Sequence, residues 1–186
     1  MKLKNTLFVL YANLITVIML WVSLFNGSIY NISFIHWFLI VVFIISSVLI
    51  AVFAVKNVSN AFRLYKNEEY NSLRRNMKVL KLGSIPYFLI NFVFYFLLFA
   101  LFFVGSRGFF IFTPIPLLLL LNVFLTYIIV LFTSSYGIGF VAVARSEKRL
   151  NNTTCIIHVL FQLCFVLDVI STILLLVKYK VSKTNI

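Results

Sequence analysis

The chain has 186 residues, of which 63% are hydrophobic, 18% aromatic and only 11% charged. This composition excludes an ordinary soluble domain, in which about 25% of the residues are charged. The length suits one compact domain over residues 1–186, with no second domain of any size.

Five apolar runs lie along the chain, each close to or above the about 20 residues that a helix needs to cross a bilayer core. None of them contains Lys, Arg or Glu. The runs are continuous, whereas strands of a membrane barrel alternate in hydrophobicity, so the sequence predicts an all-α integral membrane bundle of about five transmembrane helices. The predicted helices cover residues 7–25, 34–55, 86–104, 115–143 and 155–177.

The first run follows Lys2 and Lys4, as the core of a secretory signal follows its basic residues. Its apolar stretch is longer than the about 7–15 residues of a signal core, and no small-x-small cleavage pattern closes it. We therefore expect a retained membrane anchor.

The 16 Lys and Arg residues are unevenly distributed among the connections. The N-terminus and the second and fourth connections are basic, the first connection has no basic residue, and the third has only Arg107. The positive-inside rule then predicts a multi-pass protein of the cell membrane with a cytoplasmic N-terminus. The same alternation accounts for the net charge of +12 without a nucleic-acid partner. Trp21, Tyr30 and Trp37 fall near the predicted outer ends of the first two helices, the depth that amphipathic rings prefer.

Five full spans place the C-terminal tail outside the cell, with Lys178, Lys180 and Lys183. Three lysines on that side are unfavourable under the positive-inside rule. A re-entrant stretch in GFFIFTPIP, or a break in the long fourth run, would return the tail to the cytoplasm. Five spans with an external tail remain the expectation.

The second connection, residues 56–85, is basic and is expected in the cytoplasm. Its apolar residues recur at near-helical spacing, which predicts an amphipathic helix on the inner membrane surface, attracted by anionic headgroups. The alternative is a docking surface, from Lys56 to Ser84, for a membrane or cytoplasmic protein partner. The apolar residues concerned are Phe62, Tyr65, Leu73, Met77 and Leu80.

The stretch KNEEYNSLRR contains Glu68 and Glu69, with Arg74 five residues after the second Glu. Intramembrane proteases of the prenyl-endopeptidase type carry a Glu-Glu pair with an Arg four residues on, so the spacing here departs from theirs. A charged helix surface with Glu-to-Arg neighbours accounts for the same residues. With no nucleophile and base at a shared depth, we do not expect an enzyme.

Cys155 and Cys164 lie nine residues apart, at the start of the last run and within it. Two cysteines on different faces of one helix cannot form a disulfide, so we expect buried free thiols. His36 and His158 stand on separate helices, and neither predicts a metal site. No cofactor is expected.

The fourth run contains TSSYGIGFVAVA, in which Ser135 and Gly139 are four residues apart and Gly137 lies between them. Small residues at this spacing let helices approach closely in lipid, so close packing is expected. A hinge or an opened site at the two glycines is the alternative.

Asp168 is the one acidic residue within the five apolar runs. A carboxylate at the bilayer centre is costly, so its side chain should face protein or water and be paired or protonated. With no Lys or Arg inside any predicted span, we expect Asp168 to be neutral and hydrogen-bonded or hydrated. Counting along the helix places four residues on one face: Cys164, Asp168, Ser171 and Thr172.

The midpoints of the predicted helices indicate which residues share the depth of Asp168. The fourth helix contributes Thr126 and Tyr127, and hydroxyls of the first and third helices lie at a similar height. The sequence thus predicts an intramembrane polar site that is either a proton- or cation-linked site or a polar clasp between helices.

The segments KLGSIPYFLINF, SSYGIGF and FVLDVIS resemble those of small multi-pass bacterial membrane proteins. The resemblance covers the second half of the chain and implies neither an established function nor any site residue. A composition rich in Asn, Lys, Ile and Phe is also compatible with an AT-rich bacterial genome.

These features lead to two hypotheses for function. The first is a non-enzymatic subunit or accessory of a transporter or other membrane complex, because the chain is small and has no ATP-binding motif. The second is a stand-alone proton- or cation-linked transporter or channel that uses Asp168.

Overall fold

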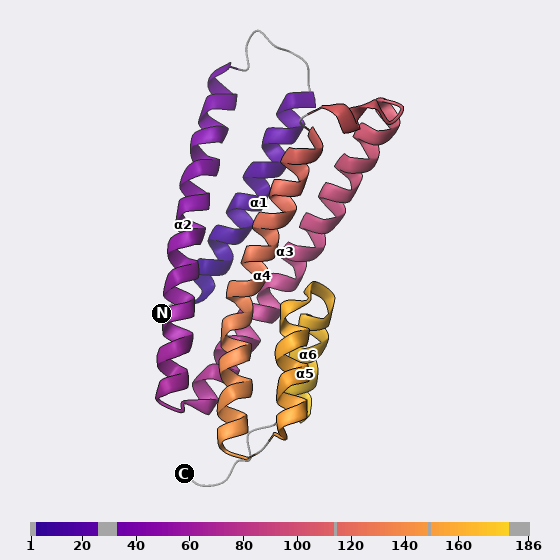
Figure 1. Cartoon of the computed structure of the whole chain (residues 1–186). Coiled ribbons are helices and arrows are strands. Elements are labelled where there is room, and N and C mark those ends of the chain that lie inside the picture. The colour runs from indigo at the N-terminus through magenta and orange to yellow at the C-terminus, as the bar shows by residue number, and fades with distance from the viewer. Residues whose placement is uncertain (1–2, 26–32, 114, 149, 179–186) are drawn as a thin grey trace. The chain divides into compact units, whose positions relative to one another are not determined.

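A computed structural model describes residues 3–25, 33–113, 115–148 and 150–178, and every regular element in these ranges is a helix (Figure 1). Four helices in the described ranges are long and apolar enough to cross a membrane, which confirms the all-α prediction. The elements are α1 (Leu3–Phe25), α2 (Ser33–Lys66), α3 (Tyr70–Gly105), the 3-10 helix η1 (Phe109–Phe112), α4 (Ile115–Ser146), α5 (Asn152–Leu163) and α6 (Phe165–Lys178).

The prediction of one long helix over residues 155–177 is wrong. The backbone at Cys164 is extended, with φ −101° and ψ 127°, so α5 ends there and α6 begins one residue later. His158 on α5 contacts Ser171 on α6 at 2.8 Å, as expected for two antiparallel helices folded back at Cys164 (Figure 1). In one straight helix, Gln162 and Asp168 would point about 120° apart, whereas the bend allows both to be buried.

The prediction of a surface helix within residues 56–85 is also wrong. α2 continues to Lys66 and α3 begins at Tyr70, which leaves a turn of only residues 67–69. Lys, Arg and Leu are good helix formers and no Gly or Pro interrupts this part of α2, so the long helix simply continues past its apolar stretch. Glu68 and Glu69 lie in the turn and are exposed.

The chain divides into two compact units. The first, Met1–Phe53 with Pro86–Phe124, contains α1, most of the apolar part of α2, the second half of α3 and the start of α4. Asn13 on α1 donates hydrogen bonds to the hydroxyls of Ser46 at 2.8 Å and Ser47 at 3.2 Å on α2. Buried polar contacts therefore join α1 to α2 within this unit.

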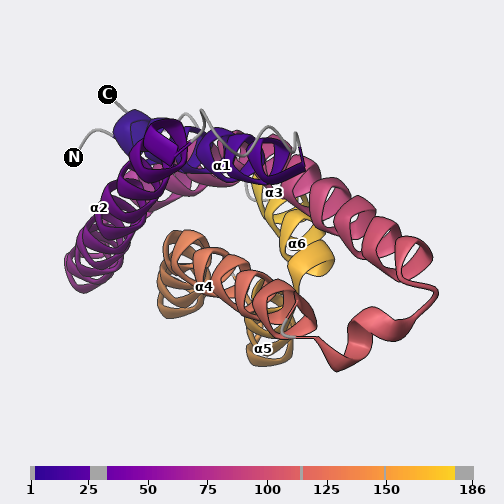
Figure 2. The same cartoon turned by 90° about the horizontal axis from the view of Figure 1, so that it is seen from above.

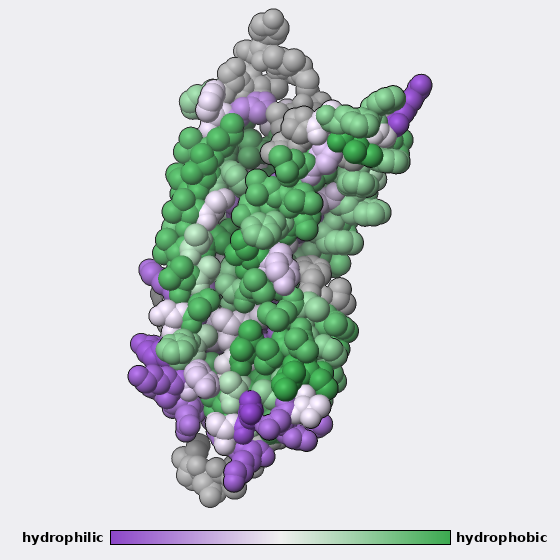
Figure 3. All heavy atoms as spheres, in the orientation of Figure 1, coloured by the Kyte–Doolittle hydropathy of each residue, from purple (hydrophilic) through white to green (hydrophobic). Residues whose placement is uncertain are grey.

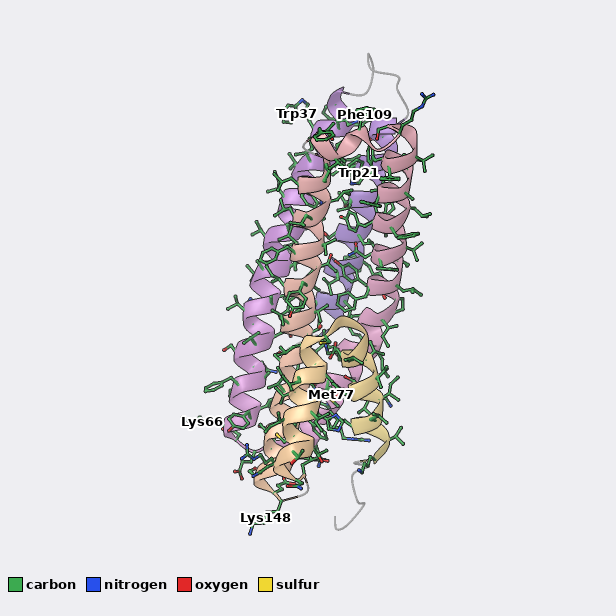
Figure 4. The ribbon with its side chains drawn as sticks, turned by 45° about the vertical axis from the view of Figure 1, so that its right-hand side comes forward. Trp21, Trp37, Lys66, Met77, Phe109 and Lys148 are labelled. Atoms are coloured by element: carbon green, nitrogen blue, oxygen red, sulfur yellow. The ribbon has the colours of Figure 1, made fainter. Side chains whose placement is uncertain are left out.

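Aromatic side chains gather at one end of the first unit, where Figure 4 labels Trp21, Trp37 and Phe109. The ring of Trp21 meets the ring of Phe102 edge-on, with centroids 5.7 Å apart, and Trp37 is 68% exposed. Tyr30, the third aromatic residue of the predicted outer group, lies outside the described residues.

The second unit is Ala54–Ile85 with Leu125–Ile186, and it contains the ends of α2 and α4, the start of α3, and α5 with α6. Its core includes Met77 and Leu80 of α3, labelled in part in Figure 4, and the rings of Tyr70 and Phe140, whose centroids are 4.6 Å apart. Figure 2 shows α6 next to α5, and the contacts of Asp168 with Lys81 and of Leu176 with Arg74 place α6 against the start of α3. α6 thus contacts helices on more than one side.

The glycines of α4 are close-packing positions. A side chain at Gly137 would meet the Gln162 amide at 2.7 Å, and one at Gly139 would meet Leu73 at 3.2 Å. α4 is an unbroken helix through both glycines, so it has no hinge or break there. Before α4, η1 is only a single short turn and does not form a re-entrant stretch.

Large apolar side chains are exposed along the helices of both units, as the green surface of Figure 3 shows. In the second unit, hydrophilic residues gather near the α2–α3 and α4–α5 turns, where Figure 4 labels Lys66 and Lys148 at the same end. Exposed apolar flanks with polar ends are typical of helices that face lipid.

Candidate functional site: a buried ion pair in the second unit

Lys81 lies on the core face of α3. It follows Met77 by four residues and precedes Ser84 by three, and all three side chains are buried. A Lys whose side chain is only 2% exposed requires an internal counter-charge, because an unpaired ammonium is costly to bury.

Asp168 supplies that counter-charge from the first turn of α6, and its side chain is also 2% exposed. Lys81 Nζ forms an ion pair with Asp168 Oδ2. The position of Asp168 near the start of α6 is itself favourable, because the N-terminal end of a helix carries a partial positive charge.

Two hydroxyls of α4 complete the surroundings of the ammonium. Lys81 Nζ donates to Ser134 Oγ at 2.6 Å and lies 3.3 Å from Thr133 Oγ1. Together with the Asp168 carboxylate, these give each of the three N–H donors of the ammonium an oxygen partner. The pair therefore joins α3, α4 and α6 at one point.

Ser134 links the ion pair to α5. Its hydroxyl lies 2.9 Å from the backbone carbonyl of Gln162 and 3.4 Å from Asp168 Oδ1. The Gln162 side chain is fully buried against Gly137, and neither its amide nitrogen nor its amide oxygen has a hydrogen-bond partner. The Thr172 hydroxyl is likewise buried without a partner.

The structure assembles only part of the predicted polar site. Asp168, Ser171 and Thr172 are buried on one face of α6, whereas Cys164 is exposed at the bend. Thr126 is half-buried and Tyr127 is exposed on α4, about two helical turns before the residues that contact the ion pair. The prediction that they share the depth of Asp168 assumed that residues 155–177 form one spanning helix.

The expectation that Asp168 lacks a cationic partner is wrong. Lys81 was assigned to a hydrated connection, but α3 includes it as a buried residue. Two sequence signals point to the residues that were missed. Lys81 keeps the helical spacing of the apolar core residues of α3, and Thr133 opens a run of four hydroxyl residues, TSSY, in a mostly apolar helix.

Metal-ligating groups do not converge in the part of the chain that the structure describes, where no three His, Cys, Asp or Glu side chains are placed to hold a metal ion. Cys155 is buried and Cys164 exposed, and both are free thiols. His36 contacts Ser23 at 3.1 Å in the first unit, and His158 contacts Ser171 in the second. The two histidines thus have separate local partners.

Comparison with protein families assigns residues 1–181 to a family described as "Family of unknown function (DUF6652)". The chain belongs to DUF6652. Comparisons of this DUF6652 chain with curated proteins and with solved structures gave no match.

The groups that surround the ion pair of this DUF6652 chain determine what it can do chemically. The ammonium is surrounded by oxygens, and the carboxylate faces the ammonium and a hydroxyl. Such a group neutralises its own charge and holds three helices together. The hydroxyls of Thr133 and Ser134 also lie within hydrogen-bonding distance of the Val130 carbonyl of their own helix.

Proposed function

We propose that the chain is a multi-pass integral membrane protein that acts as a non-enzymatic subunit or accessory of a transporter or other membrane complex. The four long helices and their exposed apolar flanks support insertion in a cell membrane. The bilayer is therefore one partner, and no nucleic-acid partner is proposed.

The distribution of basic residues supports a cytoplasmic N-terminus. By counting spans, Lys4, the α2–α3 turn and the α4–α5 turn fall on one side of the membrane, and Arg107 falls on the other. Lys2 and Arg149, which add to the basic side, lie outside the described residues. The positive-inside rule assigns the basic side to the cytoplasm.

The observation that carries the proposal is the self-contained Lys81–Asp168 pair. Asp168 has an internal counter-ion from α3, and the ammonium has three oxygen partners within the same chain. A proton- or cation-carrying site needs an acidic group that a mobile ion can reach and leave. The pair instead suits a structural clasp that holds α6 against α3 and α4.

A protein partner has a basic surface available at the cytoplasmic end. Between Lys56 and Ser84, the ends of α2 and α3 expose Lys56, Arg63, Lys66, Arg75 and Lys78. This surface suits an acidic partner protein or anionic headgroups.

The experiment uses a double variant, Lys81→Met with Asp168→Val, which removes both charges while keeping apolar bulk. Wild type and variant, both tagged, are purified in mild detergent from their own membranes, and native mass spectrometry measures the mass of each complex. A partner at fixed stoichiometry in both samples supports a subunit held by a clasp. A homogeneous wild-type monomer or homo-oligomer contradicts the subunit role.

The second candidate is the stand-alone transporter, favoured by the buried Gln162 amide and Thr172 hydroxyl, which have no partners near Asp168. Polar groups of this kind accept water or a cation when a site opens. In liposomes loaded with a pH- or cation-sensitive dye, this hypothesis predicts flux through wild-type protein and its loss in the stably folded double variant. Equal flux in the two samples contradicts it.

A further inference from the structure

We propose that α5 and α6 form a re-entrant hairpin in the cytoplasmic leaflet, with lipid acyl chains against its exposed face and anionic headgroups at its open end. The inference rests on the proposed membrane placement of the long helices. It adds how the last apolar run is inserted and from which side of the membrane the chain emerges.

The lengths of the two helices exclude a crossing by either one. α5 has 12 residues and α6 has 14. At 1.5 Å per residue these helices are about 18 and 21 Å long, against a hydrocarbon core of about 30 Å. A hairpin of this depth enters one leaflet and returns to the same side.

The exposed face of the hairpin changes character along its length. Near the bend and along both helices, the exposed side chains include Ile156, Leu160, Leu163, Leu167, Ile170 and Leu174. At the open end, the exposed polar residues are Asn151, Asn152 and Thr153 at the start of α5 and Lys178 at the end of α6, with exposed Val177 beside Lys178. An apolar bend and a polar open end match the depth profile of a leaflet. A patch for a soluble protein partner has no need of this gradient.

Two contacts with α3 set the direction of the hairpin. Lys81 meets Asp168 near the start of α6, and Arg74, two helical turns earlier on α3, donates from Nη2 to the backbone carbonyl of Leu176 at 2.7 Å. α6 therefore runs antiparallel to the start of α3. Its last turn lies beside the basic α2–α3 end of the second unit, which the proposed orientation places in the cytoplasm.

The charge of the tail agrees with this direction. When the hairpin returns the chain to the cytoplasm, Lys178 joins the basic side, and Arg107 alone of the 16 Lys and Arg residues stays on the opposite side. Lys180 and Lys183, which follow Lys178 in the sequence, lie outside the described residues. A cytoplasmic tail thus removes the conflict with the positive-inside rule that a fifth span creates.

Single-cysteine variants of the full-length chain test both parts of the proposal. One variant keeps native Cys164 at the bend and carries Cys155→Ala. Three more lack both native cysteines, through Cys155→Ala and Cys164→Ser, and each carries one new cysteine: Lys178→Cys, Glu68→Cys or Arg107→Cys. Glu68→Cys marks the α2–α3 turn, and Arg107→Cys marks the connection on the opposite side of the membrane. Each is labelled with a membrane-impermeant maleimide in intact cells and in inside-out vesicles, with labelling after SDS denaturation as the total.

We expect Lys178→Cys to label from the same side as Glu68→Cys, and Cys164 to lose labelling from both sides until SDS is added. A thiol in hydrocarbon is protected because its reactive thiolate is not formed there. Labelling of Lys178→Cys from the side of Arg107→Cys overturns the hairpin in favour of a crossing. Labelling of Cys164 as fast as Glu68→Cys overturns its insertion in lipid.

Labelling in liposomes distinguishes protection of Cys164 by lipid from protection by a covering protein. The purified Cys164 variant is reconstituted in phosphatidylethanolamine and phosphatidylglycerol, where continued protection supports acyl chains as the partner. Labelling in liposomes but not in native membranes overturns this partner in favour of a protein. If Glu68→Cys and Arg107→Cys label from the same side, the membrane arrangement of the long helices fails, and the hairpin fails with it.

Discussion

Lys81 and Asp168 stand 87 residues apart in the chain, yet they form an ion pair in which each side chain is only 2% exposed. Removing one partner of such a pair leaves an uncompensated buried charge, whereas replacing both by apolar groups removes the desolvation cost together with the attraction. A single replacement should therefore cost far more stability than replacement of both partners.

The first prediction concerns this asymmetry. Lys81→Met and Asp168→Val should each lower the free energy of unfolding by about 3–5 kcal/mol, and the double variant should return close to the wild-type value. Thr133 and Ser134 can donate to the Val130 carbonyl, at 2.9 and 2.8 Å, when the ammonium is absent. Unfolding in mixed micelles measures the cycle, and a double variant no more stable than the worse single variant contradicts the prediction.

The long helices could be predicted from the sequence, whereas the division of the last apolar run into two short helices could not. Continuous apolar runs such as residues 34–55 leave a helix as the one way to satisfy the backbone in lipid. The break at Cys164 has no Gly or Pro to announce it, and apolar composition alone does not distinguish one spanning helix from two short ones. The polar residues on either side, Gln162 and Asp168, were the available signal.

Of the two members of the ion pair, the sequence indicated Asp168 but not Lys81. Asp168 was identified because an acidic residue stands out in an apolar run. Lys81 was missed because basic residues are common beyond the ends of spanning helices, and its burial depends on the tertiary contact with α6. Local composition carries no information about that contact.

The second prediction concerns the two glycines of α4. Gly137→Ala should destabilise the protein by up to about 2 kcal/mol, because overpacking against the fully buried Gln162 outweighs the gain of about 1 kcal/mol in helix propensity. Gly139→Ala is the matched control, since the atom that it meets is the flexible tip of Leu73 at 3.2 Å. Thermal unfolding in detergent compares them, and equal midpoints for the two variants contradict the prediction.

The third prediction concerns the Gln162 amide, which is buried with no hydrogen-bond partner for either polar atom. Gln162→Met keeps the length of the side chain and removes both unsatisfied groups, so stability should rise by about 1 kcal/mol. The backbone carbonyl that Ser134 approaches is unaffected by this change. A loss of stability in the same unfolding assay would show that the amide binds water or an ion, which favours the transporter hypothesis.

The fourth prediction concerns the polar contact between α1 and α2. Asn13 donates to Ser46 at 2.8 Å in a buried setting, and hydrogen bonds between membrane helices contribute about 0.6 kcal/mol on average. Asn13→Ala and Ser46→Ala should therefore each destabilise the protein, and a double-mutant cycle should show a coupling of about this size. Asn5→Ala, at an exposed position of α1, is the control and should change little. Strictly additive effects of Asn13→Ala and Ser46→Ala would mean that the hydrogen bond between these two residues does not stabilise the contact between α1 and α2.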